Sequence, residues 1–550
     1  MNTSNFLHQR AAARIALTLA LGLLVGTATM NAQTSDQATQ EAQKSRRDAQ
    51  DEAIKQLQLQ LANIRTQLDK LQQANQTDGA GSTALPPSAT TEQATPQQSS
   101  TPPKTSTPAS SLSMDTPAAD AASSDPHAPH SDPFAFADFT WLNGNARTKD
   151  TPYATRFFSP EIRADVNYTY DFRHPQDDSI SGSSEVFRSS EVQVTQLGVG
   201  GDFHFDNVRA RVMTQFGLYS QTTPRNDASP ARGQWNLDNA YRYLSEAYGG
   251  YHFNVQHGIN VDAGIFMSYV GLFSYYQFDN WAYQPSYVSS NTPWFFNGIR
   301  VQYHPTARLK FEPWFVNGWQ SYGRFNNRPG IGGQILYRPN GKLSMLGNQY
   351  AVGRDALGVT GRTRFHTDDS VEYKYLDRPT ALVSKAAFSA TVDLGCESGG
   401  GVSCFGTGKN GPKQSFVGYM FYNRLWFDRD RYAVTIGGGA INNPGRYLVL
   451  LPPINGATAA SGTPYFTENP GDPYKAWDAS GTIDYMPSQY FTYRLEYNHR
   501  AANVPYFTGP GGVTPPGGNT FGSPGSVVSG WSPDLRKSEN RMTLAFLVKF

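Results

Sequence analysis

Polar and apolar residues alternate along much of this 550-residue chain. The clearest stretch is PEIRADVNYTYDF, residues 160–172, in which every second residue from Ile162 to Phe172 is apolar and the residues between them are polar. The last ten residues, RMTLAFLVKF, show a similar alternation and end on Phe550. A period of two over this length predicts β-strands that have one apolar and one polar face.

Two kinds of connection separate the alternating segments. Seven are tight, with sequences such as Asp-Asn and Pro-Asn-Gly that favour hairpin turns, and lie at 205–208, 253–259, 303–307, 337–342, 376–381, 427–432 and 485–490. The others are long and polar or rich in Gly and Pro, and lie at 173–190, 220–240, 271–293, 320–329, 354–369, 395–413, 442–474 and 500–538. Counting between these connections gives sixteen strands, of which the last is 540–550. The strand pattern is weakest at 342–353 and 431–441.

This alternation of short and long connections has a physical cause in a membrane. Because the bilayer core holds no water, every backbone polar group there must be paired within the protein, and a membrane-spanning sheet has to close. Apolar residues then face lipid, polar residues face the lumen, and short turns at one end alternate with long loops at the other. We therefore predict an all-β fold for residues 139–550, a transmembrane antiparallel up-and-down β-barrel of about 16 strands. A large soluble β-sandwich or β-solenoid is the alternative, but its sheet edges would need protection and the chain shows no fixed repeat.

Three further segments precede the predicted barrel. Residues 1–32 carry Arg10 and Arg14 ahead of the apolar run 15–26, which is typical of a cleaved signal peptide and too short to span a membrane. Residues 33–74 are predicted to form a periplasmic helix, and residues 75–138 a disordered linker rich in Pro, Ser and Thr. The helix carries a coiled-coil seam with spacings of three and four, formed by Ile54, Leu57, Leu61, Ile64, Leu68 and Leu71. A single amphipathic helix that lies on another surface is the alternative.

Composition agrees with a barrel and excludes one class of partner. Hydrophobic residues make up 38% of the chain and aromatic residues 13%, and they are spread thinly, whereas a soluble protein of this length would bury continuous apolar runs. The net charge of +1 gives no case for a nucleic-acid partner. The two cysteines, Cys396 and Cys404, lie in a predicted long loop of an exported chain, where we expect a disulfide rather than a metal site.

The barrel region resembles a known family. The terminal FLVKF, the aromatic-rich hairpins and the block GVGGDFHFDNVRARVMTQFG at 198–217 are similar to outer-membrane β-barrel porins of the OmpL-like type. The resemblance covers roughly residues 139–550. It implies a porin of the Gram-negative outer membrane that is surrounded by membrane lipid, with the terminal Phe550 recognised by the barrel-assembly machinery. The helix before the barrel is similar to the N-terminal arrangement of some trimeric porins, which favours a homotrimer.

We predict a water-filled pore for passive diffusion of small hydrophilic solutes or ions, with no catalytic activity and no cofactor. A structural outer-membrane anchor or envelope tether without transport is the alternative. An outer-membrane hydrolase is a second alternative, although none of the histidines lies in a recognisable catalytic signature. An energy-coupled receptor would need a globular plug before the barrel and about 22 strands.

Charged residues on the predicted lumen face are candidates for lining the pore. From residue 139 onward the chain has 37 Lys and Arg against 32 Asp and Glu, an excess of five positive charges. Arginines in a pore favour anions, so we expect a weak anion preference that high salt screens. Arg209 and Arg211 are the strongest candidates, because both lie on one face beside a tight turn with Asp202 as the nearest inward acid. The alternative is that these charges pair across strands and only keep the lumen wet. The candidates are Arg163, Asp165, Arg209, Arg211, Arg242, Glu246, Asp262, Arg300, Lys310, Arg494 and Glu496.

Overall fold

A computed structural model describes residues 132–227, 229–353, 361–404 and 411–550, together with the single residues Lys55, Val359 and Gly406. The predicted signal peptide, the coiled-coil seam and most of the predicted linker lie outside the described residues. The chain divides into two compact units, residues 1–119 and 120–550, and the second contains the β-barrel. Within the described ranges, no helix has both the length and the apolar character needed to cross a membrane.

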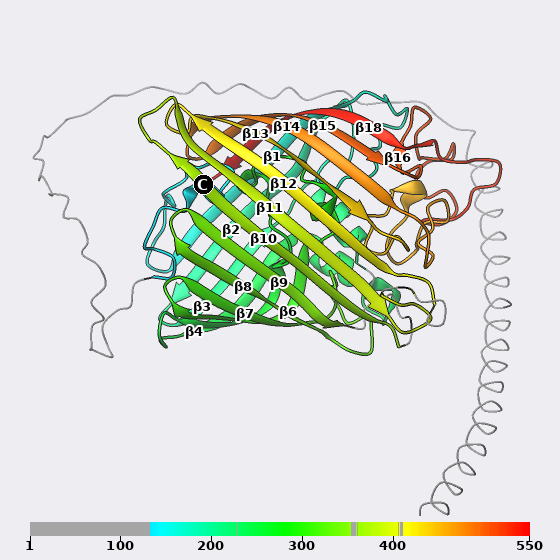
Figure 1. Ribbon diagram of the computed structural model, residues 1–550. Helices are drawn as coiled ribbons and strands as arrows, with labels where there is room; N and C mark the ends of the chain where they lie inside the picture. The colour runs from blue at the N-terminus through cyan, green and yellow to red at the C-terminus, as the bar shows by residue number, and fades with distance from the viewer. Residues whose placement is uncertain are drawn as a thin grey trace, which may run out of the picture. The chain divides into compact units, whose positions relative to one another are not determined.

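Sixteen antiparallel strands form a closed barrel in the described part of the chain (Figure 1). Each strand pairs with the next barrel strand along the chain, and the last pairs with the first, which confirms the predicted fold class and strand number. The strands are β1 (Phe158–Asp171), β2 (Val192–Phe205), β3 (Val208–Thr214), β4 (Leu244–Phe253), β5 (Ile259–Met267), β6 (Phe295–Thr306), β7 (Leu309–Val316), β8 (Gly330–Asn340), β9 (Leu343–Gly353), β10 (Thr363–Asp377), β11 (Val383–Ser398), β12 (Ser415–Phe427), β13 (Tyr432–Asn442), β14 (Lys475–Ser488), β15 (Phe491–Ala502) and β18 (Ser538–Lys549).

Strands β1 and β18 close the barrel. Arg163 lies opposite Lys549, and the pairing continues without a break to Asp171 opposite Arg541. Along β1 the polar residues from Arg163 to Asp171 are buried, whereas Tyr168 between them is 38% exposed on the outer face. The alternation in the sequence therefore separates a polar interior from an apolar exterior, as a barrel in lipid requires.

Short turns lie at one end of the barrel, the turn end, and long loops at the other, the loop end. The seven predicted tight turns all occur between the expected strands. Asp206, which opens the β2–β3 turn, has φ of 54°, a left-handed conformation that Asp adopts more readily than most residues. One predicted loop boundary is wrong, because β10 begins at Thr363 and not after residue 369. The first half of β10 presents His366 and Asp368 to the lumen and exposes Asp369 outside, so no apolar alternation marks it as a strand.

The long loops and the segment before β1 carry the remaining secondary structure. The β3–β4 loop contains α2 (Tyr219–Arg225), η2 (Ser229–Ala231) and α3 (Leu237–Tyr241), and the β5–β6 loop contains η3 (Gln277–Asp279) and α4 (Tyr287–Ser290). The β13–β14 loop contains η4 (Ile454–Gly456), and η1 (Thr140–Leu142) precedes β1. In the β15–β18 loop, β16 (Phe507–Thr508) and β17 (Leu535–Arg536) form a two-stranded sheet. A disulfide joins Cys396 of β11 to Cys404 in the β11–β12 loop.

Candidate pore and its constriction

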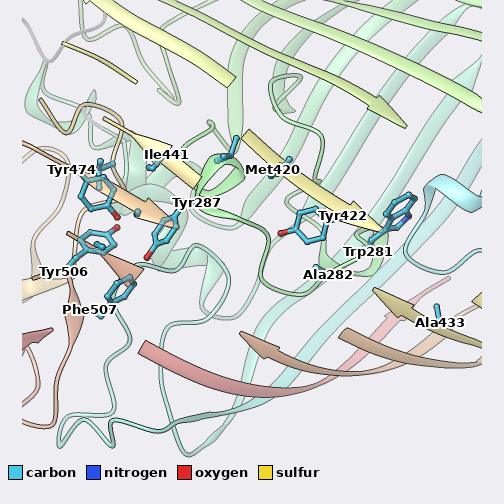
Figure 2. Close-up of a cluster of buried hydrophobic side chains, with 14 of the residues drawn as sticks. Trp281, Ala282, Tyr287, Met420, Tyr422, Ala433, Ile441, Tyr474, Tyr506 and Phe507 are labelled. Atoms are coloured by element: carbon cyan, nitrogen blue, oxygen red, sulfur yellow. The ribbon is translucent and has the colours of Figure 1, made fainter. Parts of the chain in front are cut away.

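The β5–β6 loop, residues 268–294, folds into the barrel lumen, and we call it the constriction loop. Its side chains are buried to an unusual degree for a loop, since Trp281 is 2% exposed and Tyr283 is 0% exposed. The loop contributes to a cluster of buried hydrophobic side chains that also includes residues of β12, β13 and two long loops. Figure 2 shows Tyr287 of this loop beside Tyr474, Tyr506 and Phe507. The constriction loop is thus packed against the barrel wall from inside.

A buried arginine on β15 binds the backbone of the constriction loop. Arg494 donates hydrogen bonds to the carbonyl oxygens of Gln277 and Ala282 at 3.0 and 3.1 Å. Its other terminal nitrogen donates to Asn280 O at 2.6 Å. Two further bonds, at 2.7 and 3.0 Å, pair it with the Asp484 carboxylate. Arg494 is 0% exposed, and all five of its guanidinium bonds stay within the protein.

Two more buried arginines bind the same loop. Arg424 on β12 donates to Trp281 O at 3.0 Å and to the carboxylate of Asp484 at 2.7 Å. Arg500 on β15 donates to Pro285 O at 2.6 Å. Because backbone carbonyls that leave water need a partner, these arginines replace the water that a loop at the surface would bind.

Buried carboxylates bind the amide groups of the constriction loop. Glu496 on β15 accepts hydrogen bonds from the backbone N–H groups of Tyr283 and Gln284 at 2.6 and 2.8 Å. Asp478 on β14 accepts from Tyr287 N at 2.9 Å. Charge-assisted bonds of this kind are about twice as strong as neutral ones. Together with the arginines, they hold the loop to the wall formed by β12, β14 and β15.

Strand β1 and the end of β18 also bind the constriction loop. The Tyr283 hydroxyl donates to Asp165 Oδ1 at 2.8 Å. Arg163 and Lys549 lie 2.8 and 3.1 Å from the Asp279 carboxylate. Burial alone would raise the pKa of the Asp279 carboxyl, but the charges of Arg163 and Lys549 outweigh burial and hold the pKa at about 2. Asp279 is therefore ionised and paired near neutral pH.

A cavity of about 340 Å³ lies beside the constriction loop, and we call it the lumen cavity. Its walls are formed by the loop, including Phe273 and Asn280, and by the inward faces of β8, β9 and β10. On the barrel side it is lined by Gln334, Leu336, Arg338, Ser344, Leu346 and Glu372. The lumen cavity thus lies between the constriction loop and the wall of β8 to β10, to which the loop is bonded at Tyr269: Gln334 Nε2 donates to Tyr269 O at 3.0 Å, and the Tyr269 hydroxyl donates to Gln349 O at 2.8 Å.

A second cavity of about 330 Å³, the mouth cavity, lies among the long loops. It shares the lining residues Thr292 and Trp294 with the lumen cavity, so the two cavities are neighbours. Its charged lining residues are Arg362, Arg364, Glu397 and Glu468. Arg364 pairs with Glu397 at 2.8 Å, and burial raises the pKa of the Glu468 carboxyl to about 8.

The strongest candidate from the sequence, Arg211, lies at the centre of an ion-pair cluster. Its guanidinium group is 2.8 Å from Asp202, 2.9 Å from Glu246 and 3.0 Å from Glu161. Glu161 also pairs with Arg163. Arg211 therefore does not present an uncompensated positive charge to the lumen.

The remaining candidates on β3 and on β5 to β7 are paired in the same way. Asp262 lies between Arg209 and Arg300, at 3.3 and 3.0 Å. The guanidinium group of Arg300 also lies over aromatic rings of β4 and β5. Lys310 pairs with Glu312 two residues along β7. The charged residues of this wall are thus paired with one another, mostly across strands, as the alternative interpretation of the sequence expected.

The structure places all but one of the pore-lining candidates from the sequence on the lumen side of barrel strands. Ten of the eleven lie on inward faces of barrel strands. Arg242 precedes β4, next to α3 in the β3–β4 loop, and so lies at the loop end. The candidates fall into two groups, one around Arg211 and one in which Arg494, Glu496 and Asp165 bind the constriction loop.

Several residues of the site escaped the sequence reasoning. Arg424 and Arg500 occupy inward positions of β12 and β15 and could have been found from the alternation. The constriction loop also carried a signal, because residues 273–294 contain eight aromatic residues, too many for a loop that remains in water. Nothing in the sequence indicated that Arg362, Arg364 and Glu468 line one cavity. The first two lie directly before and at the start of β10 and the third lies in the β13–β14 loop, so only the folded chain brings them together. Among the described residues, no three His, Cys, Asp or Glu side chains are grouped so that they could hold a metal ion.

Several solved structures of outer-membrane proteins match most of this chain at low sequence identity. The outer membrane channel DcaP of Acinetobacter baumannii is 13% identical over 72% of this chain and 96% of its own, with a TM-score of 0.40. The anion-selective porin from Comamonas acidovorans is 11% identical over 72% of this chain and 99% of its own, with a TM-score of 0.40. Salmonella typhi OmpF, in a complex with daunomycin, is 11% identical over 72% and 97%, with a TM-score of 0.37.

A comparison with curated proteins found no match. The family model described as "Putative beta-barrel porin-2, OmpL-like" matches residues 163–529, which is more than half of the chain. The match runs from within β1 to the β15–β18 loop, and so includes the constriction loop, the mouth cavity and all of the lumen cavity's lining except Leu142 and Asn143. The chain is an outer-membrane β-barrel that belongs to the OmpL-like family of β-barrel porins.

Proposed function

We propose that the chain forms a water-filled pore for passive diffusion of small hydrophilic solutes or ions, and that it has no catalytic activity. One observation carries the proposal, the space that remains in the lumen beside a firmly held loop. The constriction loop is bonded to strands on several sides of the barrel, among them β1, β9, β12, β14 and β15, yet the lumen cavity of about 340 Å³ remains between it and the inward faces of β8 to β10. A loop fixed in this way narrows a passage without filling it.

The lining of the lumen cavity suits polar solutes. Gln334, Ser344, Arg338 and Glu372 supply hydrogen-bond donors and acceptors along one wall. Such groups can take over part of the hydration of a solute or ion that passes a narrow section. Since the mouth cavity adjoins the lumen cavity at Trp294, we propose one continuous path through both.

Liposome swelling tests this proposal against its alternatives. Vesicles that contain the purified full-length protein are expected to swell in isotonic solutions of small sugars, and to swell more slowly as the sugar becomes larger. Folded barrels that give no swelling would support an anchor or tether without transport. Hydrolysis of lipids or esters by the same preparation would support an outer-membrane hydrolase.

We further propose a weak anion preference that originates at the loop end and not at Arg209 and Arg211, whose charges are paired. Near neutral pH, the mouth cavity carries two arginines against one acidic partner, Glu397, because the raised pKa of Glu468 keeps most of the Glu468 carboxyl protonated. The excess of one positive charge at an opening attracts anions and repels cations.

This preference should weaken in alkaline solution. Glu468 is neutral below its pKa of about 8 and ionised above it, so raising the pH adds one negative charge to the mouth cavity. For an ion that passes within ~8 Å in water, a unit charge contributes about 0.5 kcal/mol, with opposite signs for an anion and a cation, so the anion-to-cation permeability ratio should fall roughly fivefold between about pH 6.5 and about pH 9. Glu468→Gln should remove this fall, and Asp472→Asn in the same loop should retain it. Reversal potentials at low salt measure the ratio, and an identical pH dependence in Glu468→Gln would contradict the assignment.

We propose that the loop end faces outward and the turn end faces the periplasm, where residues 33–74 and 75–138 lie after removal of signal peptide 1–32. An even number of strands returns the chain to its starting side, which supports a common side for both ends of the barrel. Protease sites inserted at 503–537 should be cleaved in intact cells, and sites inserted at 75–131 only after the outer membrane is permeabilised. Cleavage of the N-terminal site alone in intact cells would show that the barrel has the opposite orientation.

We also propose that the predicted seam from Ile54 to Leu71 joins three copies of the chain into a trimer. Leu61→Asp would place a carboxylate in this apolar seam, where an unpaired charge is poorly tolerated. The variant should migrate as a smaller species than the wild-type protein in mild detergent, whereas Gln60→Asp outside the seam should not. An unchanged size for Leu61→Asp would show that the helix does not hold the oligomer together.

A further inference from the structure

The segment just before β1 crosses the turn end of the barrel. Phe134 N donates to Ala307 O in the β6–β7 turn at 2.8 Å, and Thr148 Oγ1 donates to Gln489 O in the β14–β15 turn at 2.8 Å. Strands β7 and β15 stand eight places apart in the closed ring of sixteen, so these two contacts lie on opposite sides of the opening. We call residues 134–148 the crossing segment.

Side chains anchor the crossing segment along its course. Trp141 is 0% exposed, and its indole nitrogen donates to Gly341 O in the β8–β9 turn at 3.1 Å. Asn145 is also 0% exposed, and its amide nitrogen donates to Ser488 O at 3.0 Å and lies 3.2 Å from Thr492 Oγ1. Such buried, satisfied polar contacts fix a segment far more firmly than surface contacts do.

The crossing segment also meets the constriction loop inside the lumen. Gly144 N donates to Asp279 O at 2.9 Å, and the indole nitrogen of Trp281 donates to Trp141 O at 3.2 Å. Arg424 bridges the two, since it donates to Gly144 O at 2.7 Å and to Trp281 O at 3.0 Å. The approach is so close that a Cβ atom on Gly144 would lie 2.4 Å from backbone oxygens of the constriction loop.

The crossing segment forms part of the wall of the passage. Leu142 and Asn143 line the lumen cavity together with Asn280 of the constriction loop and Arg338 and Glu372 of the barrel. The cavity is therefore bounded at the turn end by residues that lie outside every barrel strand.

We propose that residues 140–148 form an inner constriction of the pore, which limits the size of the solute that leaves the lumen at the turn end. This inference rests on the proposed pore function and adds a second narrow section to it. The crossing segment and the constriction loop brace one another, so displacing the segment widens the passage at both.

Single-channel recordings of the full-length protein test this inference with two independent variants. Gly144→Ala forces the crossing segment away from the constriction loop, and the matched Gly481→Ala adds the same methyl group where nothing lies within 4 Å. We expect a higher conductance and a larger limiting sugar size for Gly144→Ala, and wild-type values for Gly481→Ala. Heat-modifiable migration in gels shows which variants contain a folded barrel.

A reversible crosslink provides the second test and does not depend on Gly144→Ala folding. Asn145→Cys with Thr492→Cys should hold the segment in place when oxidised, with wild-type conductance, and release it on reduction, with a rise in conductance. Wild-type protein with and without reductant controls for the disulfide between Cys396 and Cys404.

The outcomes separate the two proposals. Wild-type conductance in both Gly144→Ala and the reduced double-cysteine variant would overturn the inner constriction and leave the pore function standing. Folded barrels that never conduct, in wild-type or variant form, would overturn both. A silent wild-type protein whose Gly144→Ala variant conducts would support both, with the segment closing the pore at rest.

Discussion

Arg494→Ala should release the constriction loop and raise the single-channel conductance. The substitution removes three bonds to the carbonyl oxygens of Gln277, Asn280 and Ala282 and one partner of the buried Asp484. Breaking a buried ion pair costs roughly 3–5 kcal/mol, and the lower end applies here because Arg424 remains beside Asp484. We therefore expect lower thermal stability together with larger and noisier current steps.

The control for this variant is Arg209→Ala. It also removes a lumen arginine, but Arg209 pairs only with Asp262, is partly exposed and has no contact with the constriction loop among the described interactions. Conductance should stay close to wild type in Arg209→Ala. Equal conductance in folded Arg494→Ala and wild-type barrels would show that the loop does not limit the pore.

Arg211→Ala should turn the ion preference of the pore toward cations. Arg211 is in contact with three carboxylates, those of Glu161, Asp202 and Glu246, and removing it leaves Glu161 paired with Arg163 and takes from Asp202 and Glu246 their ion-pair partner. One positive charge lost within ~8 Å of the ion path shifts the energies of an anion and a cation in opposite directions, so it changes the anion-to-cation permeability ratio roughly fivefold in water, and more where the lumen is less polar. The shift should be largest at low ionic strength, because salt screens exposed charges.

Arg211→Lys separates charge from geometry. Lysine keeps the positive charge but cannot bond three carboxylates with one planar fork, so we expect wild-type selectivity with reduced thermal stability. Reversal potentials in a salt gradient measure the first property and the temperature of barrel unfolding the second. Unchanged selectivity in Arg211→Ala would show that the cluster lies away from the path of permeating ions.

The membrane-spanning part of the fold was predictable because lipid imposes a simple rule on the sequence. Every strand must alternate, and each tight turn must carry residues such as Asp206 that tolerate an unusual backbone conformation. The prediction was wrong at the start of β10, where Asp368 faces the lumen and Asp369 the exterior, so polarity on both faces imitates a loop.

The interior was less predictable, because it depends on contacts between residues far apart in the chain. Arg211 seemed free in the sequence with Asp202 nearby, but Glu161 and Glu246 reach it only once three other strands are in register. The path of the constriction loop likewise depends on Arg424, Arg494 and Glu496, which come from strands more than a hundred residues later. Alternation fixes which side chains point inward but not which of them meet.

Planar-bilayer recording of the purified full-length protein is the most direct test of whether it forms a pore. We expect discrete, ohmic current steps that report an open aqueous path, with a modest anion preference at low salt. Folded barrels that insert into the bilayer and give no current steps, in wild-type protein and in Arg494→Ala alike, would contradict a pore.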